Sequence, residues 1–301
     1  DDKPMLGLTL SEAVEIMRGP VGSSIKLTIV REGLEDPIEV EVTRAVIKLT
    51  AAKVRVDNDV VIMRVTTFNE QTIPNLEDGM KATMEKIGVS QPKGFILDLR
   101  NNPGGLLSVA ISVTDLFLDQ GEIVSTRDRE GKGDRYKASK GDITKGKPIV
   151  ILINAGSASA SEIVAGALQD HRRAIVLGTK SFGKGSVQSV LPMGQSGGIR
   201  LTTARYYTPS GRSIQALGVT PDVFLEFKKA EKNEEEEKRR TFSEADLEGA
   251  LSNDSLTDAE KEMLRKEEIS FQEANKRRNK DNQLAHAIDL IEGLSVLSLE
   301  E

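Results

Sequence analysis

Three short apolar runs in the middle of the chain predict buried strands. They lie at residues 93–100, 148–153 and 174–177, and each contains several consecutive apolar positions. Residues 108–118 and 163–168 follow two of these runs and have helical periodicity. The apolar positions of 163–168 fall on one side, which predicts an amphipathic helix. Strands therefore alternate with helices in this region.

Shorter patterns predict further elements on both sides of this region. Residues 10–17 predict a helix, and residues 25–31 and 38–44 alternate like the two strands of a hairpin. The remaining expected elements are a strand pair at 54–56 and 60–65, a helix at 76–87, a surface loop at 130–140 and a strand at 186–192.

The character of the chain changes near residue 228. Residues 231–240 contain nine charged residues in ten, which indicates a solvated helix or a linker, and another helix begins near Thr257. Residues 282–297 are more apolar and place five side chains on one face: Leu284, Ala287, Ile288, Ile291 and Leu294. That face must pack either on the core or on another subunit. A homo-oligomer formed through this helix is therefore one of two alternatives.

Composition excludes several classes of function. The 301 residues include no cysteine, which removes disulfides and thiol chemistry. The net charge of −6 and the lack of a basic stripe argue against nucleic acid as a partner. No apolar run reaches transmembrane length. The chain starts at Asp1 without a signal peptide, and we expect an earlier part to have been removed.

A serine cluster lies where strand 148–153 leads into the next helix. Ser157, Ser159 and Ser161 alternate with alanines, and Glu162 follows them. Unpaired N–H groups at a helix N-terminus are suited to hold an oxyanion. Ser159 and Glu162 also fit a capping box, which is the favoured interpretation of this segment alone. The pattern does not choose among the three serines.

A serine nucleophile needs a base, and the chain offers a lysine more readily than a histidine. His171 follows Ser159 at the far end of the same predicted helix, about 18 Å away at the helical rise, and His286 has no motif around it. Lys184 lies in a glycine-rich stretch, between two glycines that give its backbone unusual freedom. The alternative is an ordinary exposed lysine on a turn.

The same stretch nearly matches a phosphate-binding loop. Residues 178–184 fit G-x-x-x-x-G-K, but Gly185 stands where Ser or Thr is required. A phosphate-binding loop should also open a helix, whereas residues 186–192 predict a strand. Nucleotide binding is therefore disfavoured. A third stretch, Pro103-Gly104-Gly105, predicts a turn whose backbone N–H groups are not shielded by side chains. These groups can bind an oxyanion. The alternative is a plain turn without a ligand.

Together these motifs resemble the carboxyl-terminal processing proteases, the tail-specific serine peptidases. The resemblance runs from about residue 5 to residue 226, in the order of that family. The matching motifs are DLRNNPGG at 98–105, GSASASEI at 156–163, FGKGSVQ at 182–188 and RYYTPSGRSIQ at 205–215, with Pro221-Asp222 after the last.

The resemblance implies a Ser/Lys dyad, in which Ser159 is the nucleophile, Lys184 the general base and Gln188 the group that orients the lysine. Lysine titrates near pH 10.4 in water, about three units too high for a base at neutral pH, so the site must desolvate it. No metal or organic cofactor is needed. The implied oxyanion donors are the backbone N–H groups of three residues: Gly104, Gly105 and Ala160.

The resemblance also implies the fold. We expect an α/β protease core of ClpP/crotonase-like layering at 47–227, preceded by the second half of a PDZ domain at 1–46. A charged linker and a helical C-terminal region follow at 228–301. PDZ domains capture a peptide C-terminus at a sheet edge, but the half with the carboxylate-binding loop is absent from this chain. The alternative for 1–46 is a small β-rich domain without a ligand.

The implied function is a serine endopeptidase that cleaves unstructured C-terminal regions of proteins through an acyl-enzyme. Its implied location is the periplasm or cell envelope of a bacterium. If a PDZ domain gates the protease, Ser159 and Lys184 should be misaligned without substrate, more than about 4 Å apart. The alternative function is a catalytically silent PDZ scaffold that binds protein C-termini.

Overall fold

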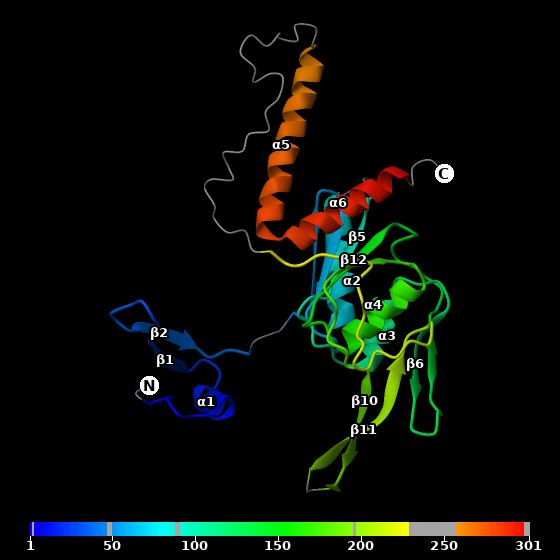
Figure 1. Ribbon diagram of the computed structural model, residues 1–301. Helices are drawn as coiled ribbons and strands as arrows, with labels where there is room; N and C mark the ends of the chain where they lie inside the picture. Colours follow the sequence, from blue (N-terminus) through cyan, green and yellow to red (C-terminus); the bar gives the residue numbers. More distant parts are fainter. Residues whose placement is uncertain (2, 47–49, 88–90, 195–196, 229–256, 298–301) are drawn as a thin grey trace. The chain divides into compact units, whose positions relative to one another are not determined.

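The chain divides into two compact units, Asp1–Leu49 and Thr50–Glu301 (Figure 1). The predicted charged segment at 231–240 lies outside the residues described by the structure, a computed structural model. The described residues are 1, 3–46, 50–87, 91–194, 197–228 and 257–297.

The first unit consists of one helix and a hairpin. Helix α1 (Leu10–Met17) begins with a capping box, in which the Glu12 carboxylate accepts the Thr9 N–H at 2.8 Å. Strands β1 (Ser24–Ile29) and β2 (Ile38–Thr43) pair antiparallel, so the predicted hairpin is confirmed. Among the described residues of this unit, Ile25 is the only apolar side chain that is fully buried.

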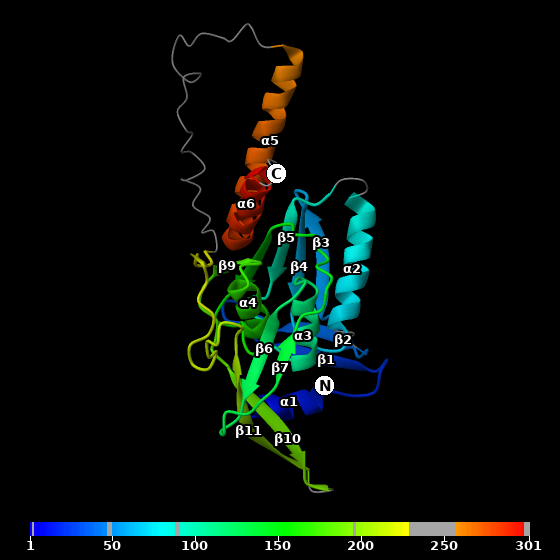
Figure 2. The ribbon, with the colours of Figure 1, turned by 90° about the vertical axis from the view of Figure 1, so that its right-hand side faces the viewer.

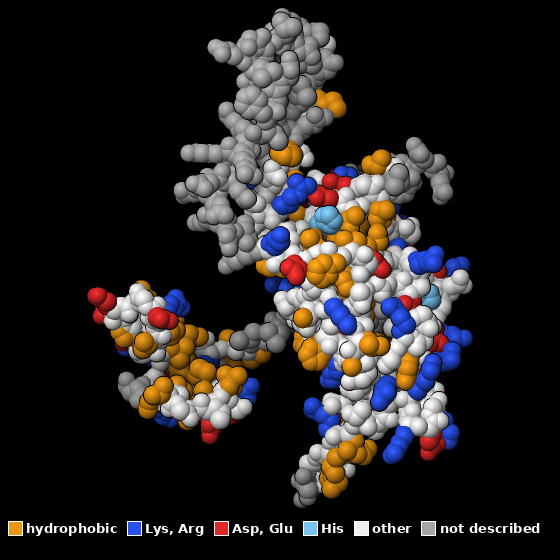
Figure 3. Space-filling view, viewed as in Figure 1, with side chains coloured by type: hydrophobic (Ala, Val, Ile, Leu, Met, Phe, Trp, Pro, Cys, Tyr) orange, Lys and Arg blue, Asp and Glu red, His pale blue; other side chains and the backbone are white. Residues whose placement is uncertain are grey.

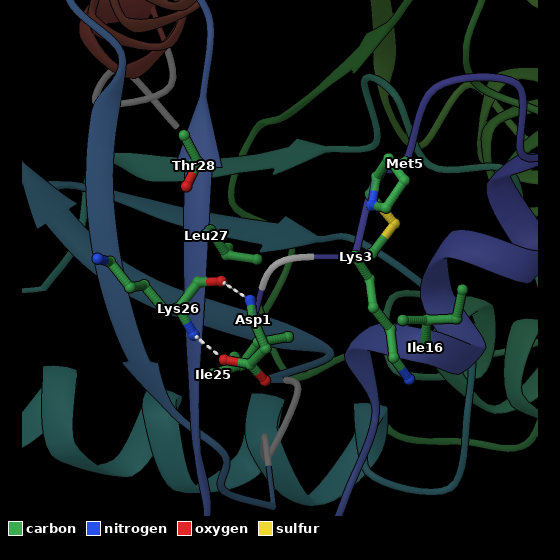
Figure 4. Close-up of a pocket in the computed structure, with 9 residues that line it drawn as sticks. Asp1, Lys3, Met5, Ile16, Ile25, Lys26, Leu27 and Thr28 are labelled. Atoms are coloured by element: carbon green, nitrogen blue, oxygen red, sulfur yellow. Dashed lines mark hydrogen bonds between the residues drawn. The ribbon is translucent and has the colours of Figure 1, made fainter.

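A hollow of ≈ 410 Å³ lies beside β1 in this unit (Figure 4). The terminal ammonium of Asp1 donates to the carbonyl of Lys26 at 2.6 Å, and the Asp1 carboxylate accepts the Lys26 N–H at 2.9 Å. These two bonds hold the first residue against β1. Met5, Ile16 and Leu27 contribute apolar lining to the hollow.

The second unit is built on a six-stranded sheet of order β12-β9-β8-β5-β4-β3. Strands β3 and β4 pair antiparallel, and every other neighbouring pair is parallel. The strands predicted for this sheet are confirmed. Their bounds are β3 (Ala52–Asp57), β4 (Val60–Val65), β5 (Gly94–Asp98), β8 (Ile149–Ile153), β9 (Ile175–Gly178) and β12 (Val223–Phe224).

Helices cover both faces of this sheet (Figures 1 and 2). In β5, Phe95 and Leu97 belong to the core on one face, while Ile96 belongs to the core on the other. Strands buried on both faces read as continuous apolar runs, which is why they were visible in the sequence. Helices α2 (Thr72–Ile87), α3 (Leu107–Asp115) and α4 (Ala160–Asp170) cover the first face, and α6 (Asn282–Leu297) the second.

A second, antiparallel sheet extends from this core as a long hairpin (Figure 1). It contains β10 (Ser186–Pro192), β11 (Gly198–Tyr207), β6 (Glu122–Arg127) and β7 (Arg135–Lys137). The predicted surface loop at 130–140 is partly wrong, because β7 pairs with β6 there. Apolar side chains such as Leu191 and Leu201 are exposed on the hairpin (Figure 3).

Two predictions about helices have different outcomes. The amphipathic helix predicted at 163–168 is wrong in one respect: residues 160–168 of α4 are all buried, because α3, β6 and the sheet surround them. The apolar face of α6 packs on the core, with Ile288 and Ile291 fully buried. A long helix, α5 (Asp258–Lys280), precedes α6. Within the described part of the chain, no helix has the length and apolar character that crossing a membrane requires.

Candidate active site

The junction between β8 and α4 holds Ser159 in a strained conformation. Its φ of 56° and ψ of −112° lie outside the regions that residues with a side chain normally occupy. Such backbone strain costs about 1–3 kcal/mol and is concentrated at functional sites. A strained turn from strand to helix is also the geometry that presents the nucleophilic serine in α/β-hydrolases.

The three serines of the cluster differ in what their hydroxyl groups bind. Ser157 and Ser161 are completely buried, and their hydroxyls donate to the backbone carbonyls of Leu99 and Asn102 at 2.8 and 2.9 Å. Ser159 is half-buried, and its hydroxyl donates no hydrogen bond to any described residue. Two of the three hydroxyls are therefore structural, and one is available for chemistry.

Glu162 connects the serine junction, residues 154–162 between β8 and the first turn of α4, to the lysine loop, residues 178–184. Its buried carboxylate accepts the N–H groups of Ser159 at 2.7 Å and Lys184 at 2.9 Å on one oxygen. The other oxygen accepts the Gly183 N–H and the Ser181 hydroxyl, both at 2.6 Å. The predicted capping box between Ser159 and Glu162 is thus present. The contacts of Glu162 with the lysine loop had no signal in the sequence, because the partners lie about twenty residues further along.

The Pro-Gly-Gly turn packs directly against the serine junction. A Cβ placed on Gly104 would lie 2.9 Å from both the nitrogen of Ala160 and the Cβ of Ser159, so only glycine fits there. The Gly104 N–H donates to the Asn102 side chain at 2.9 Å, and its role as an oxyanion donor stays a prediction. Among the described residues, the N–H groups of Gly105 and Ala160 have no acceptor.

The side chains of the implied dyad, Ser159 and Lys184, are not hydrogen-bonded to each other in the described structure. Lys184 is half-buried, and Gln188 lies exposed in β10 at a shift in its register with β11. Among these described side chains, no hydrogen bond links Lys184 to Ser159 or to Gln188. The structure therefore brings together the backbones of Ser159 and Lys184, while a separation above about 4 Å between hydroxyl and amine stays a prediction.

The lysine loop does not have the structure of a phosphate-binding loop. Residues 178–184 lead into strand β10, whereas a phosphate-binding loop leads into a helix whose N-terminus holds the anion. The nucleotide-binding alternative therefore lacks the helix it needs.

Comparison with known proteins gives the same family throughout. The profile of Peptidase family S41 matches residues 59–225. The carboxy-terminal-processing protease of Bartonella bacilliformis is 56% identical over 227 residues, which cover 75% of this chain and 52% of that protein. The carboxy-terminal processing protease CtpA of Bacillus subtilis is 36% identical over 226 residues, covering 74% and 47%. The chain thus spans about half the length of the curated relatives it matches.

A solved structure shows the same fold. The photosystem II D1 C-terminal processing protease superposes with a TM-score of 0.56 at 29% identity, covering 73% of this chain and 60% of that one. The family match spans the Pro-Gly-Gly turn, the serine junction and the lysine loop. Because that match covers more than half of the sequence, this chain belongs to Peptidase family S41.

Proposed function

We propose that this protein is a serine endopeptidase of the carboxyl-terminal processing type, with Ser159 as its nucleophile. The observation that carries the proposal is the difference among the three serines. The hydroxyls of Ser157 and Ser161 donate hydrogen bonds to backbone carbonyls, whereas Ser159 is half-buried at the strained start of α4 and its hydroxyl donates none to a described residue. Membership of Peptidase family S41 supports the same reaction.

Lys184 acts as the general base in the proposed reaction. Its neutral amine takes the proton of the Ser159 hydroxyl, and the serine oxygen bonds to the carbonyl carbon of a peptide. The N–H groups of Gly105 and Ala160 stabilise the oxyanion. The peptide C–N bond breaks, the leaving amine takes the proton from Lys184, and water then hydrolyses the acyl-enzyme. Gln188 orients the lysine, and no metal or organic cofactor takes part.

Alignment of the dyad by substrate is part of this proposal. The Glu162 carboxylate already fixes the backbones of Ser159 and Lys184. A change in the rotamer of the Lys184 side chain, with a small movement of the loop around it, can therefore bring the amine to the Ser159 hydroxyl. A protease that is aligned only when substrate is bound would spare other unstructured chains. We propose that the first unit, with one helix and a hairpin, is the second half of a PDZ domain that takes part in this control.

We further propose that the substrates are proteins with free, unstructured C-terminal regions and that the enzyme works in the cell envelope. The names of the bacterial and chloroplast relatives describe processing at the carboxyl terminus. The division into a protease core at 47–227 and a C-terminal region at 228–301 belongs to the same proposal. The apolar face of α6 is occupied by its own sheet, so any homo-oligomer uses other surfaces.

Parallel alanine variants of two serines test the proposal. Ser159→Ala should stop cleavage of an unstructured polypeptide, followed by mass spectrometry of the products. Ser161→Ala is the matched control: it should keep turnover and lose only about 0.5–1.5 kcal/mol of stability, because the Asn102 carbonyl loses one hydrogen bond but keeps the Ala158 N–H at 3.0 Å. Wild-type turnover in Ser159→Ala would refute the assignment. A wild-type protein that binds the polypeptide without cleaving it would favour the silent scaffold.

A further inference from the structure

A buried ion pair connects the C-terminal region to the loop beside Ser159. Arg100 follows β5 and is only 7% exposed, and its guanidinium donates two parallel hydrogen bonds to Asp281, at 2.9 and 2.7 Å. This bidentate arrangement is the strongest geometry that arginine and a carboxylate can form. Arg100 also donates to Gln283 at 3.0 Å. The partners are about 180 residues apart in sequence, and Asp281 lies outside the region matched by the family.

The Asp281 carboxylate makes two kinds of structural contact at once. It is the residue between α5 and α6, and its carboxylate accepts the N–H of Leu284, which caps the first turn of α6. Asp98, at the end of β5, binds the other edge of the same guanidinium with two bonds of 2.9 Å. Arg100 is thus held between a carboxylate of the sheet and a carboxylate of the C-terminal region.

The residues next to Arg100 hold the serine junction. The carbonyl of Leu99 accepts the Ser157 hydroxyl, and the N–H of Asn101 donates to the Asn154 side chain at 2.9 Å. Asn102 continues the series, since its carbonyl accepts the Ser161 hydroxyl. The turn that packs against Ser159 therefore begins directly after Arg100.

We propose that Asp281 is a positioning residue of the protease site. Acting through Arg100, it fixes the turn at 101–105 against Ser159, so that docking of α6 completes the oxyanion site. A buried guanidinium that loses one of its carboxylates must seek another partner or water, and the backbone beside it moves accordingly. Displacement of a catalytic group by about 1 Å can reduce the rate about 100-fold. This inference rests on the proposed protease function.

Isosteric and capping variants of Asp281 in the whole protein test the proposal. Asp281→Asn keeps the shape, and Asp281→Ser keeps a helix cap but cannot form the paired bonds to Arg100. Both should lower kcat about 10- to 100-fold at a temperature where melting curves show a folded protein, with KM changed less than about threefold. Asp289→Asn is the matched control, because this carboxylate lies in α6, the helix that Asp281 caps, and pairs with Arg278 and not with Arg100.

Hydrogen exchange supplies a readout that does not depend on activity. In both Asp281 variants, the backbone amides at 101–105 should exchange faster, while those in the middle of α6 stay protected. Unchanged kcat and unchanged exchange at 101–105 would overturn the proposal, as would loss of protection throughout α6, since Asp281 would then only dock the helix. Failure of the wild-type protein to cleave would refute the proposed function, whereas the exchange result would still decide whether Asp281 controls the turn.

Discussion

Glu162 is the residue on which the geometry of the site depends most. Sequence motifs could indicate Ser159, Lys184 and the glycine turn, because each has a recognisable local pattern. They could not show which serine hydroxyl is free, since the carbonyls that bind Ser157 and Ser161 belong to a loop almost sixty residues earlier. Nor could they show three of the four donors that meet on the Glu162 carboxylate, those of Ser181, Gly183 and Lys184. Contacts between distant loops leave no pattern in a single sequence.

Replacing Glu162 with glutamine should therefore damage both activity and stability. An amide presents an NH₂ group to N–H donors that now bind an oxygen, so some of the four hydrogen bonds are lost. We expect kcat to fall at least tenfold and stability to fall by about 1–3 kcal/mol, measured by peptide cleavage and urea unfolding. Glu85→Gln, on the exposed side of α2, is the control and should change neither. Full activity in Glu162→Gln would show that this carboxylate does not align the site.

Lys184→Arg should be as inactive as Lys184→Ala. Arginine keeps the positive charge, but it cannot lose a proton in a protein and so cannot act as a base. Cleavage rates and circular dichroism of both variants check this result. Turnover of the unmodified protein should also rise with pH, because only a neutral amine accepts the serine proton. An active arginine variant would instead make Lys184 a fixed positive charge.

Helix α6 shows how an element outside the family match can be essential to the core. The strands of the main sheet have apolar side chains on both faces, and α6 covers the face that α2, α3 and α4 leave open. Hydrophobic periodicity predicted the apolar face of α6 correctly, but it did not decide whether that face packs on the core or on another subunit. It failed for α4, which is buried all round, and for β7 and β11, whose side chains are mostly exposed.

Ile288→Ala should destabilise the second unit by about 2–5 kcal/mol, because it removes a fully buried side chain from the contact between α6 and the sheet. Chemical denaturation measures the loss. Val296→Ala, on the same helix but 66% exposed, should cost less than about 0.5 kcal/mol. Equal effects of the two substitutions would mean that α6 is not packed on the sheet in solution.

At the scale of the whole molecule, three carboxylates make stability depend on pH. Burial would raise the pKa values of Asp142, Asp170 and Asp281, but hydrogen bonds and neighbouring arginines outweigh it and hold each pKa below its usual range. Arg173, Arg212 and Arg100 are the respective ionic partners. Each ionised carboxylate therefore stabilises the folded state relative to the unfolded one.

The sign of the pH effect follows from these depressed pKa values. The contribution is complete above the pKa of the unfolded chain, about 3.9, and is lost as the pH falls through the lower pKa of the folded state. We expect the free energy of unfolding in urea to change little through these groups between about pH 7 and 5 and to drop below about pH 4. Stability that increased on going from pH 5 to pH 3 would contradict this assignment.

Trapping the acyl-enzyme tests the central claim most directly. The protein is mixed with an unstructured substrate, quenched in acid within the first turnovers, digested with trypsin and sequenced by mass spectrometry. The account predicts an acyl group, derived from the N-terminal side of the cleaved bond, on Ser159, present in Ser161→Ala and absent in Ser159→Ala. An acyl group on Ser157 or Ser161, or cleavage that persists in Ser159→Ala, would contradict it.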